Sequence, residues 1–205
     1  MKQATHSTRE RILQQGLDLL SETGLSGVTL GVLADQVGMS KSGLFAHFRS
    51  KEDVQIALLQ QMTEVASATV VLPAMGHAAG LPRLTALVHL WLGWTKRAGL
   101  RGGCPIASAL FELDDIEGPV RDKVLAMESH WRGLLGQMVQ ETIDLGQLSP
   151  TLDKEQFVWE LCGIYLSHHA SYRFIHDPSA DTRAYTAFES LLERSGAEAQ
   201  QEAAL

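Results

Sequence analysis

Apolar residues recur at helical spacing along almost the whole chain. The first such segment begins at Ser7 with a capping-box sequence and is expected to end at Gly24, and its buried stripe is Ile12, Leu13, Leu17 and Leu20. The later segments with this pattern are residues 50–71, 82–99, 105–113, 118–145, 153–176 and 181–195. Glycine and proline separate these segments, and none alternates as a strand would. The sequence therefore predicts an all-α protein.

Two short helices follow one another closely between residues 29 and 48. Thr29 is a favourable N-cap for the first helix, and Gly38 stands where its C-cap is expected. Ser40 caps the second helix, in which Leu44 and Phe48 are four residues apart and can pack back on the first helix. This arrangement predicts a helix-turn-helix.

The outward face of the second helix carries small or polar residues, namely Lys41, Ser42, Gly43, Ala46 and His47. A glycine inside a helix costs about 1 kcal/mol relative to alanine, and close approach to DNA would justify Gly43. The alternative is a loose surface helix with a chance glycine. The two-helix pattern alone leaves both interpretations open.

This segment resembles the DNA-binding domain of the TetR family of bacterial transcriptional regulators. The matching positions are Thr29, Ala34, Val37, Gly38, Met39, Ser40, Leu44, Phe45, His47, Phe48, Lys51 and Glu52. Phe45 departs from the family, which usually has a tyrosine whose hydroxyl bonds a phosphate. The resemblance implies a three-helix DNA-binding domain (1–50) and a larger helical domain for effector binding and dimerisation (51–196). The residues after Gly196 are expected to form a flexible tail (197–205).

The residues expected to contact operator DNA are Thr29, Ser40, Lys41, Ser42, Gly43, Phe45, His47 and Lys51. Lys51 follows the N-cap of the next helix, where a cation and free backbone amides can bind a phosphate. The distribution of charge also favours the N-terminal part of the chain as the part that contacts DNA. The first 55 residues are neutral overall, so the rest carries the whole net charge of −7 and would repel DNA.

The segment 118–145 carries an apolar seam of Val120, Val124, Met127, Trp131, Leu134 and Met138. With Trp91, Trp94 and Phe111, this seam could form an aromatic and methionine-rich interior. Such a stripe is more often core than pocket. The TetR resemblance, however, implies a small-molecule cavity within these helices. The candidate ligand-binding residues are Trp91, Trp94, Phe111, Met127 and Trp131, which favour an apolar or aromatic effector.

The segment 153–176 is apolar on more than one face and therefore needs two partners. The family resemblance implies a homodimer through the last two helices. The final segment, 181–195, repeats Ala184, Phe188, Leu191 and Leu192, and Phe188 is expected to lie in the shared interface.

Other site chemistries have little support in the sequence. His168 and His176 lie two turns apart, but no cluster completes a zinc site, so neither a metal nor a cofactor is expected. The weak enzyme candidates are Cys104 and the acidic group Glu112, Asp114 and Asp115, and neither has a base at an interpretable spacing.

The chain shows no targeting or membrane signal. Its polar start is unlike a signal peptide, and its longest apolar run contains Pro73 and is too short to span a bilayer. A cytoplasmic protein without membrane contact is therefore expected. Two functions stay open, the first being a dimeric, ligand-responsive transcriptional regulator, most simply a repressor. The alternative is a helical enzyme or small-molecule-binding protein whose N-terminal domain does not act on DNA.

Overall fold

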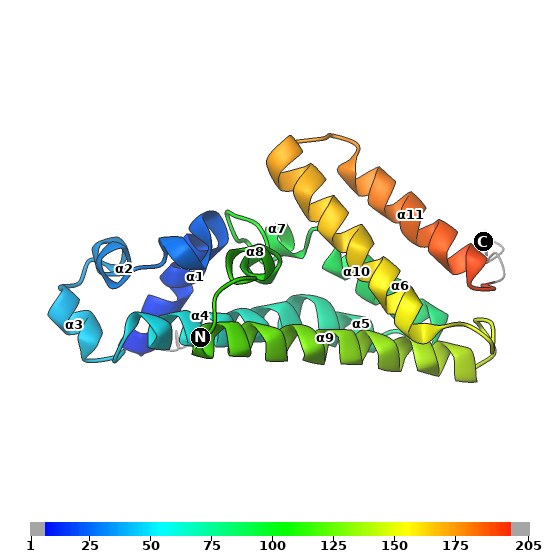
Figure 1. Ribbon diagram of the computed structural model, residues 1–205, viewed down its shortest axis with the longest axis horizontal. Coiled ribbons are helices and arrows are strands. Elements are labelled where there is room, and N and C mark those ends of the chain that lie inside the picture. Colours follow the sequence, from blue (N-terminus) through cyan, green and yellow to red (C-terminus); the bar gives the residue numbers. More distant parts are fainter. Residues whose placement is uncertain (1–6, 198–205) are drawn as a thin grey trace, which may run out of the picture. The chain divides into compact units, whose positions relative to one another are not determined.

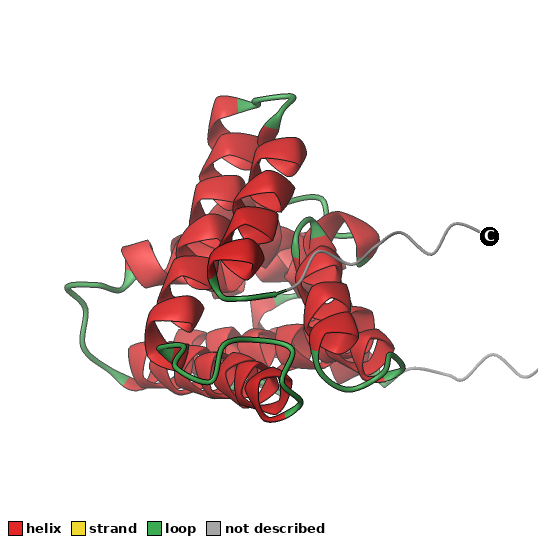
Figure 2. Cartoon of the chain, turned by 90° about the vertical axis from the view of Figure 1, so that its right-hand side faces the viewer, coloured by secondary structure: helices red, strands yellow, loops and turns green. Residues whose placement is uncertain are grey.

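The computed structural model describes residues 7–197, and this part of the chain consists of helices and short connections without a strand (Figure 2). The all-α prediction is confirmed. The earlier helices are α1 (Thr8–Gly27), α2 (Leu30–Val37), α3 (Lys41–Phe45), α4 (Lys51–Ala66), α5 (Leu72–Met75), α6 (Leu81–Trp91), α7 (Trp94–Arg97) and α8 (Pro105–Glu112) (Figure 1). The later ones are α9 (Pro119–Asp144), α10 (Lys154–Ala170) and α11 (Ala180–Arg194), and π-helical turns, η1 (Ser67–Val71) and η2 (Ser171–Ile175), extend α4 and α10.

The described residues divide into two compact units. The first unit comprises residues 7–67 and 95–128, and the second comprises residues 68–94 and 129–197. The predicted functional boundary after residue 50 remains a prediction. Of the predicted tail 197–205, all but Ala197 lies outside the described residues.

In the first unit, α1 begins as predicted and ends later. Ser7 and Glu10 form the capping box, with each side chain accepting a hydrogen bond from the other residue's backbone N–H. Gly24, with φ 68° and ψ −174°, is a kink rather than the end, because a further turn follows it to Gly27. The core of the unit is formed by fully buried side chains of α1 to α4, including Ile12, Leu17, Leu33, Leu44 and Leu58.

One predicted helix is interrupted. The segment 82–99 was expected to be continuous, but α6 ends at Trp91 and α7 begins at Trp94. Between them Gly93 has φ 71°, a left-handed conformation that only glycine adopts at low cost. Residues 51–71 are helical throughout, as predicted, with Ser50 as the N-cap, and the helical segment continues from η1 directly into α5.

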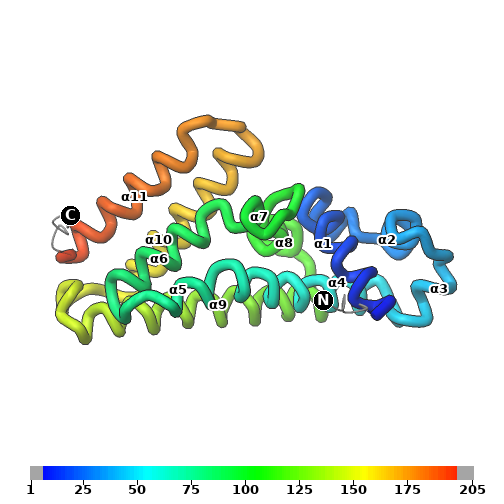
Figure 3. Tube along the Cα trace, turned by 180° about the vertical axis from the view of Figure 1, so that it is seen from behind, coloured from blue at the N-terminus to red at the C-terminus, as the bar shows by residue number. Residues whose placement is uncertain are grey.

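In the second unit, α10 and α11 form an antiparallel pair (Figure 1; Figure 3). The apolar stripe of α11 faces the interior of this unit, and Phe188 is only 1% exposed. The expected place of Phe188 in a shared interface is therefore wrong, because its own chain already covers the ring. None of the described helices is long and apolar enough to span a membrane.

Candidate functional site

The turn between α2 and α3 is built from local hydrogen bonds that its sequence specifies. Thr29 caps α2, since its Oγ1 accepts a hydrogen bond from the backbone N–H of Val32 at 3.2 Å. Gly38 follows in the left-handed conformation (φ 67°, ψ 35°), and the N–H of Met39 then bonds the carbonyl of Ala34 at 2.9 Å. These bonds close the end of α2 and direct the chain into α3.

The second short helix is fixed by a hydrogen bond at its start and by buried side chains on its inner face. Ser40 Oγ accepts a hydrogen bond from the N–H of Gly43 at 3.1 Å, and Leu44 and Phe48 are buried against the other helices of the unit. The helix ends at Phe45, so Ala46 and His47, which were expected on its outward face, lie in the turn that follows. A Cβ at position 43 would lie 3.3 Å from Ser40 Oγ, so room for this cap gives Gly43 a structural reason as well.

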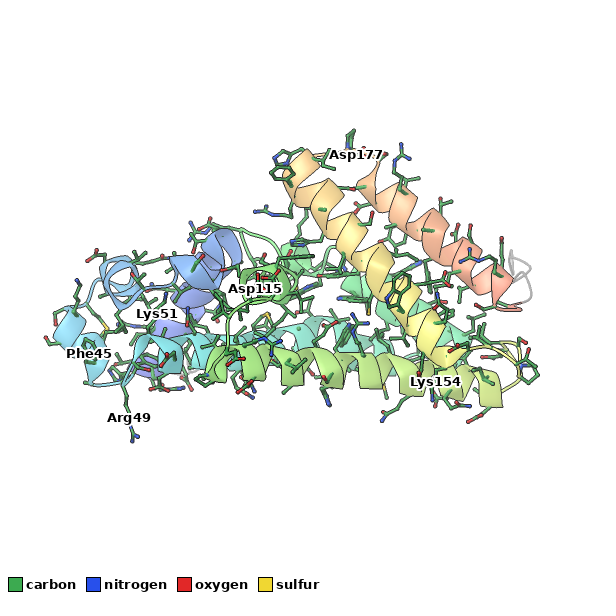
Figure 4. The ribbon with its side chains drawn as sticks, in the orientation of Figure 1. Phe45, Arg49, Lys51, Asp115, Lys154 and Asp177 are labelled. Atoms are coloured by element: carbon green, nitrogen blue, oxygen red, sulfur yellow. The ribbon has the colours of Figure 1, made fainter. Side chains whose placement is uncertain are left out.

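The exposed side of α3 carries both polar and apolar groups. Lys41 and Ser42 are exposed, and the Phe45 ring is 51% exposed at the end of the helix (Figure 4). The Lys41 side chain reaches back over the start of α2, because a Cβ at Gly31 would lie 3.2 Å from Lys41 Cε. This surface therefore combines the Lys41 cation, which lies over the start of α2, with small groups that permit close approach.

Two further cations follow α3. Lys51 is the first residue of α4 and is exposed, behind a cap in which Ser50 Oγ accepts a hydrogen bond from the Asp53 N–H at 3.1 Å. Arg49 is exposed and its side chain extends away from the ribbon in Figure 4, while its backbone N–H bonds Asp53 Oδ2 at 2.9 Å. The sequence-based site omitted Arg49, although its place directly before the Ser50 cap could have revealed it.

A further cation, Arg9 of α1, contacts an aromatic ring. Its guanidinium lies over the Phe48 ring, 5.2 Å from the ring centroid. A cation–π contact of this kind contributes to packing between α1 and the end of the α3 segment.

In the second unit, four aromatic side chains from α6, α9, α10 and the start of α7 form one cluster: Trp91, Trp94, Trp131 and Tyr165. The Trp91 ring stacks on Tyr165 with centroids 4.1 Å apart and meets Trp131 edge-on at 4.9 Å. The Trp94 indole N–H donates to the Tyr165 hydroxyl at 3.0 Å. We call this group the aromatic cluster. Tyr165 lies beside the main apolar seam of its helix and was not among the ligand-binding residues that the sequence predicted.

The other two candidate ligand residues lie elsewhere. Phe111 belongs to the first unit and is 68% exposed, so its expected position in an aromatic interior is wrong. Helix α8 buries the small side chains of Ala107 and Ala109 instead. Met127 lies in the part of α9 that belongs to the first unit and is half-buried.

A surface groove of about 810 Å³ runs between α9 and α10 in the second unit. Gly133 and Gly136 line it from α9, whereas Lys154 and Trp159 line it from α10. Its lining carries both basic and acidic side chains, including Arg132 and Glu141, and Figure 4 marks Lys154. Nothing in the spacing of the sequence indicated this groove.

One of the histidines noted in the sequence, His168, has structural partners. His168 Nε2 lies 2.7 Å from Asp181 Oδ1, and its ring stacks on Tyr172 with centroids 5.8 Å apart. Partial burial, together with the nearby Arg173 and His168, lowers the pKa of His169. Across residues 7–197 no three or more His, Cys, Asp or Glu side chains are grouped as metal ligands.

Two family models match the chain. Residues 12–58 match the model of bacterial regulatory proteins of the tetR family, and residues 80–188 match the tetracyclin repressor-like C-terminal domain. Among curated proteins, the nucleoid occlusion factor SlmA of Cronobacter sakazakii is 27% identical over 183 residues, which cover 88% of this chain and 92% of SlmA.

Solved structures share the fold. A TetR transcriptional regulator from Chloroflexus aurantiacus superposes with a TM-score of 0.79 and 25% identity, covering 91% of this chain and 92% of that one. The structure of AibR in complex with isovaleryl coenzyme A and operator DNA gives a TM-score of 0.68 at 18% identity, covering 88% of this chain and 97% of AibR. The second likeness concerns the fold alone.

Proposed function

Because this chain belongs to the TetR family of bacterial transcriptional regulators, we propose that it is a homodimeric repressor that an apolar or aromatic effector releases from its operator. The observation that carries the proposal is the exposed surface of α3 and the start of α4. It presents Lys41, Arg49 and Lys51 beside small polar groups, on a helix whose other side is anchored by Leu44. We place the protein in the cytoplasm, where its DNA would be.

In this proposal α3 enters the major groove and the cations flanking it contact phosphates. Lys41 and Ser42 would reach base edges, since they are exposed on the first turn of α3. Lys51 and Arg49 would bind the backbone, because Lys51 stands at a helix start whose amides favour an anion. Thr29, Ser40, Gly43, Phe45 and His47 complete the proposed surface.

Dimerisation would use an exposed stripe of α10 and η2. The stripe consists of Trp159, Gly163, Leu166, Ala170 and Phe174, which repeat at steps of three and four on one side of the helix. Trp159 is 65% exposed and Phe174 is 87% exposed, although both are large and apolar. The small residues between them would let a second α10 approach closely. Exposed apolar stripes of this kind mark interaction surfaces.

Effector control would act through the second unit. AibR shows that a protein of this fold can bind a small molecule and operator DNA. In our chain the aromatic cluster offers large apolar surfaces, which suit an apolar or aromatic compound. Release requires that the effector binds the DNA-free shape more tightly, and by linkage DNA must then weaken effector binding by the same factor.

The test is a gel shift with DNA from the region upstream of the protein's own gene. We expect a discrete complex with one near-palindromic fragment, and about 10³-fold or greater preference over unrelated DNA at physiological salt. The Lys41→Ala and Ser42→Ala variants should change which half-site bases are preferred. Binding without any sequence preference would contradict the proposal and favour a small-molecule-binding protein that does not act on DNA.

A further inference from the structure

Among the described residues, the Trp131 indole Nε1 is a buried side-chain nitrogen that has no hydrogen-bond partner. Buried polar groups in folded proteins are nearly always paired, and each exception calls for an explanation. The neighbouring Trp94 shows the usual situation, because its indole N–H donates to the Tyr165 hydroxyl. Two indoles of one aromatic cluster therefore differ: one N–H is satisfied by the protein and the other is not.

Packing alone does not account for an indole at position 131. Trp131 contributes its ring edge to Trp91, a contact that phenylalanine could also make without a buried donor. The residue is half-buried although its Nε1 is fully shielded. A small movement of the surrounding side chains would give an incoming group access to this donor.

We propose that the effector is an uncharged compound with an apolar, ring-sized body and one oxygen acceptor, and that this oxygen accepts a hydrogen bond from Trp131 Nε1. The inference rests on the proposed effector control and specifies the ligand's chemistry. The oxygen follows from the unpaired donor. The apolar body follows from the Trp91 ring beside Trp131 and from the Tyr165 ring stacked on Trp91. The lack of charge follows because the four cluster side chains are neutral, and an unpaired ion among them would be strongly disfavoured.

The experiment compares 1-indanone with indane, two probes that differ in one carbonyl oxygen. Each is titrated into the ¹⁵N-labelled full-length chain without DNA, and the tryptophan indole N–H signals are followed by NMR. The Trp131 signal is the one that the Trp131→Phe variant lacks. In wild type we expect indanone to bind about 5-fold more tightly than indane, which is the size of one net hydrogen bond, and to shift the Trp131 signal.

The matched variants are Trp131→Phe and Trp94→Phe. Trp131→Phe should bind both probes equally, because only the donor is lost. Trp94→Phe should keep the preference for indanone, since the indole N–H that it removes is already bonded to Tyr165. If Trp131→Phe fails to fold, the Trp131 signal is the one that the Trp91→Phe, Trp94→Phe and Trp159→Phe variants all retain. A shift of this signal in wild type with indanone, but not with indane, then decides the question.

Three results would overturn the assignment. They are a Trp131→Phe variant that still prefers indanone, an indanone complex that leaves the Trp131 signal unmoved, and no binding of either probe up to its solubility limit. The first would mean that water or another protein group, and not Trp131, donates the hydrogen bond to the indanone oxygen. DNA takes no part in this measurement. A failure of operator binding would therefore contradict the proposed function while leaving the binding result standing.

Discussion

The carboxylate of Glu112, at the end of α8, accepts a hydrogen bond from the backbone N–H of Ser26 at 2.8 Å. Its other oxygen accepts one from the N–H of Leu25 at 3.2 Å. Both amides follow the kink at Gly24, so the carboxylate caps the last turn of α1 from a distant part of the chain. Within the first unit, this contact ties α1, which packs against the helices of the proposed DNA-binding surface, to α8. It gives a structural role to a residue of the acidic group that looked like a weak catalytic candidate.

The Glu112→Ala variant should lower the free energy of unfolding by about 1 to 2 kcal/mol, because two backbone amides lose a charged acceptor. Urea denaturation measures the change. The matched control is Glu117→Ala, an exposed acid for which we expect a change within about 0.5 kcal/mol. Equal effects of the two variants would show that the cap contributes nothing.

Gly24 and Gly99 are two glycines that differ in the space beside them. Both have a positive φ, but a Cβ at Gly24 would overlap the Glu112 carboxylate, whereas a Cβ at Gly99 meets nothing within 4 Å. Gly99→Ala should cost about 1 to 2 kcal/mol, from strain alone. Gly24→Ala should cost more. The φ of 68° and ψ of −174° at Gly24 suit glycine almost alone, and the overlap adds an extra cost because Glu112 must leave its amide partners.

This extra cost should disappear when Gly24→Ala is made in the Glu112→Ala background. A double-mutant cycle in urea measures the coupling. Additive effects would mean that the overlap is relieved without breaking the cap.

The Lys51→Ala variant should weaken binding to all DNA sequences alike, since phosphate contacts carry no base information. The slope of log affinity against log salt should fall in magnitude by about 0.9, which corresponds to one phosphate. Fluorescence anisotropy at four salt concentrations provides the measurement. Lys96→Ala removes an exposed cation outside α2 to α4 and should leave the slope unchanged. An unchanged slope in Lys51→Ala would remove Lys51 from the interface.

Gly163→Glu should convert the proposed dimer to monomers. Nothing lies within 4 Å of a Cβ at Gly163, so the protomer can accept the side chain, but a helix crossing at this position would bury its charge at a cost of about 3 kcal/mol or more. Sedimentation equilibrium measures whether each variant is a dimer or a monomer. Gly133→Glu, at an equally open helical glycine of α9, should remain dimeric. A wild-type chain that sediments as a monomer would refute the interface.

The lowered pKa of His169 predicts a pH dependence of stability. Burial disfavours the charged imidazole in the folded chain, and the nearby Arg173 and His168 add to this effect. The unfolded chain therefore binds the proton more readily, and the free energy of unfolding should fall as the pH drops below about 6.5.

Urea denaturation at pH 7.5 and pH 5 tests this effect. His169→Gln should lose less stability than wild type over this interval, whereas His130→Gln, at an exposed position, should behave as wild type. If His169→Gln keeps the full wild-type loss, another group is responsible.

The sequence by itself determined the helices, because their signals are local. Caps at Ser7, Thr29, Ser40 and Ser50 act within three residues, so the backbone amides that they satisfy are fixed by adjacent sequence. The helix-turn-helix and its exposed residues follow from the same short-range rules. The differences between the predicted and the observed helix boundaries were also local: a kink at Gly24, a break at Gly93 and a short α3.

Only the tertiary structure decided which apolar faces meet and which stay exposed. Periodicity marked Phe188 and Phe111 alike as apolar, yet one ring is enclosed by its own unit and the other faces solvent. The Glu112 contact and the stacking of Trp91 on Tyr165 join residues far apart in the chain, and no local pattern encodes such pairs. Hydrophobic burial is non-directional, so a sequence states how much apolar surface must be covered, and only the folded chain states what covers it.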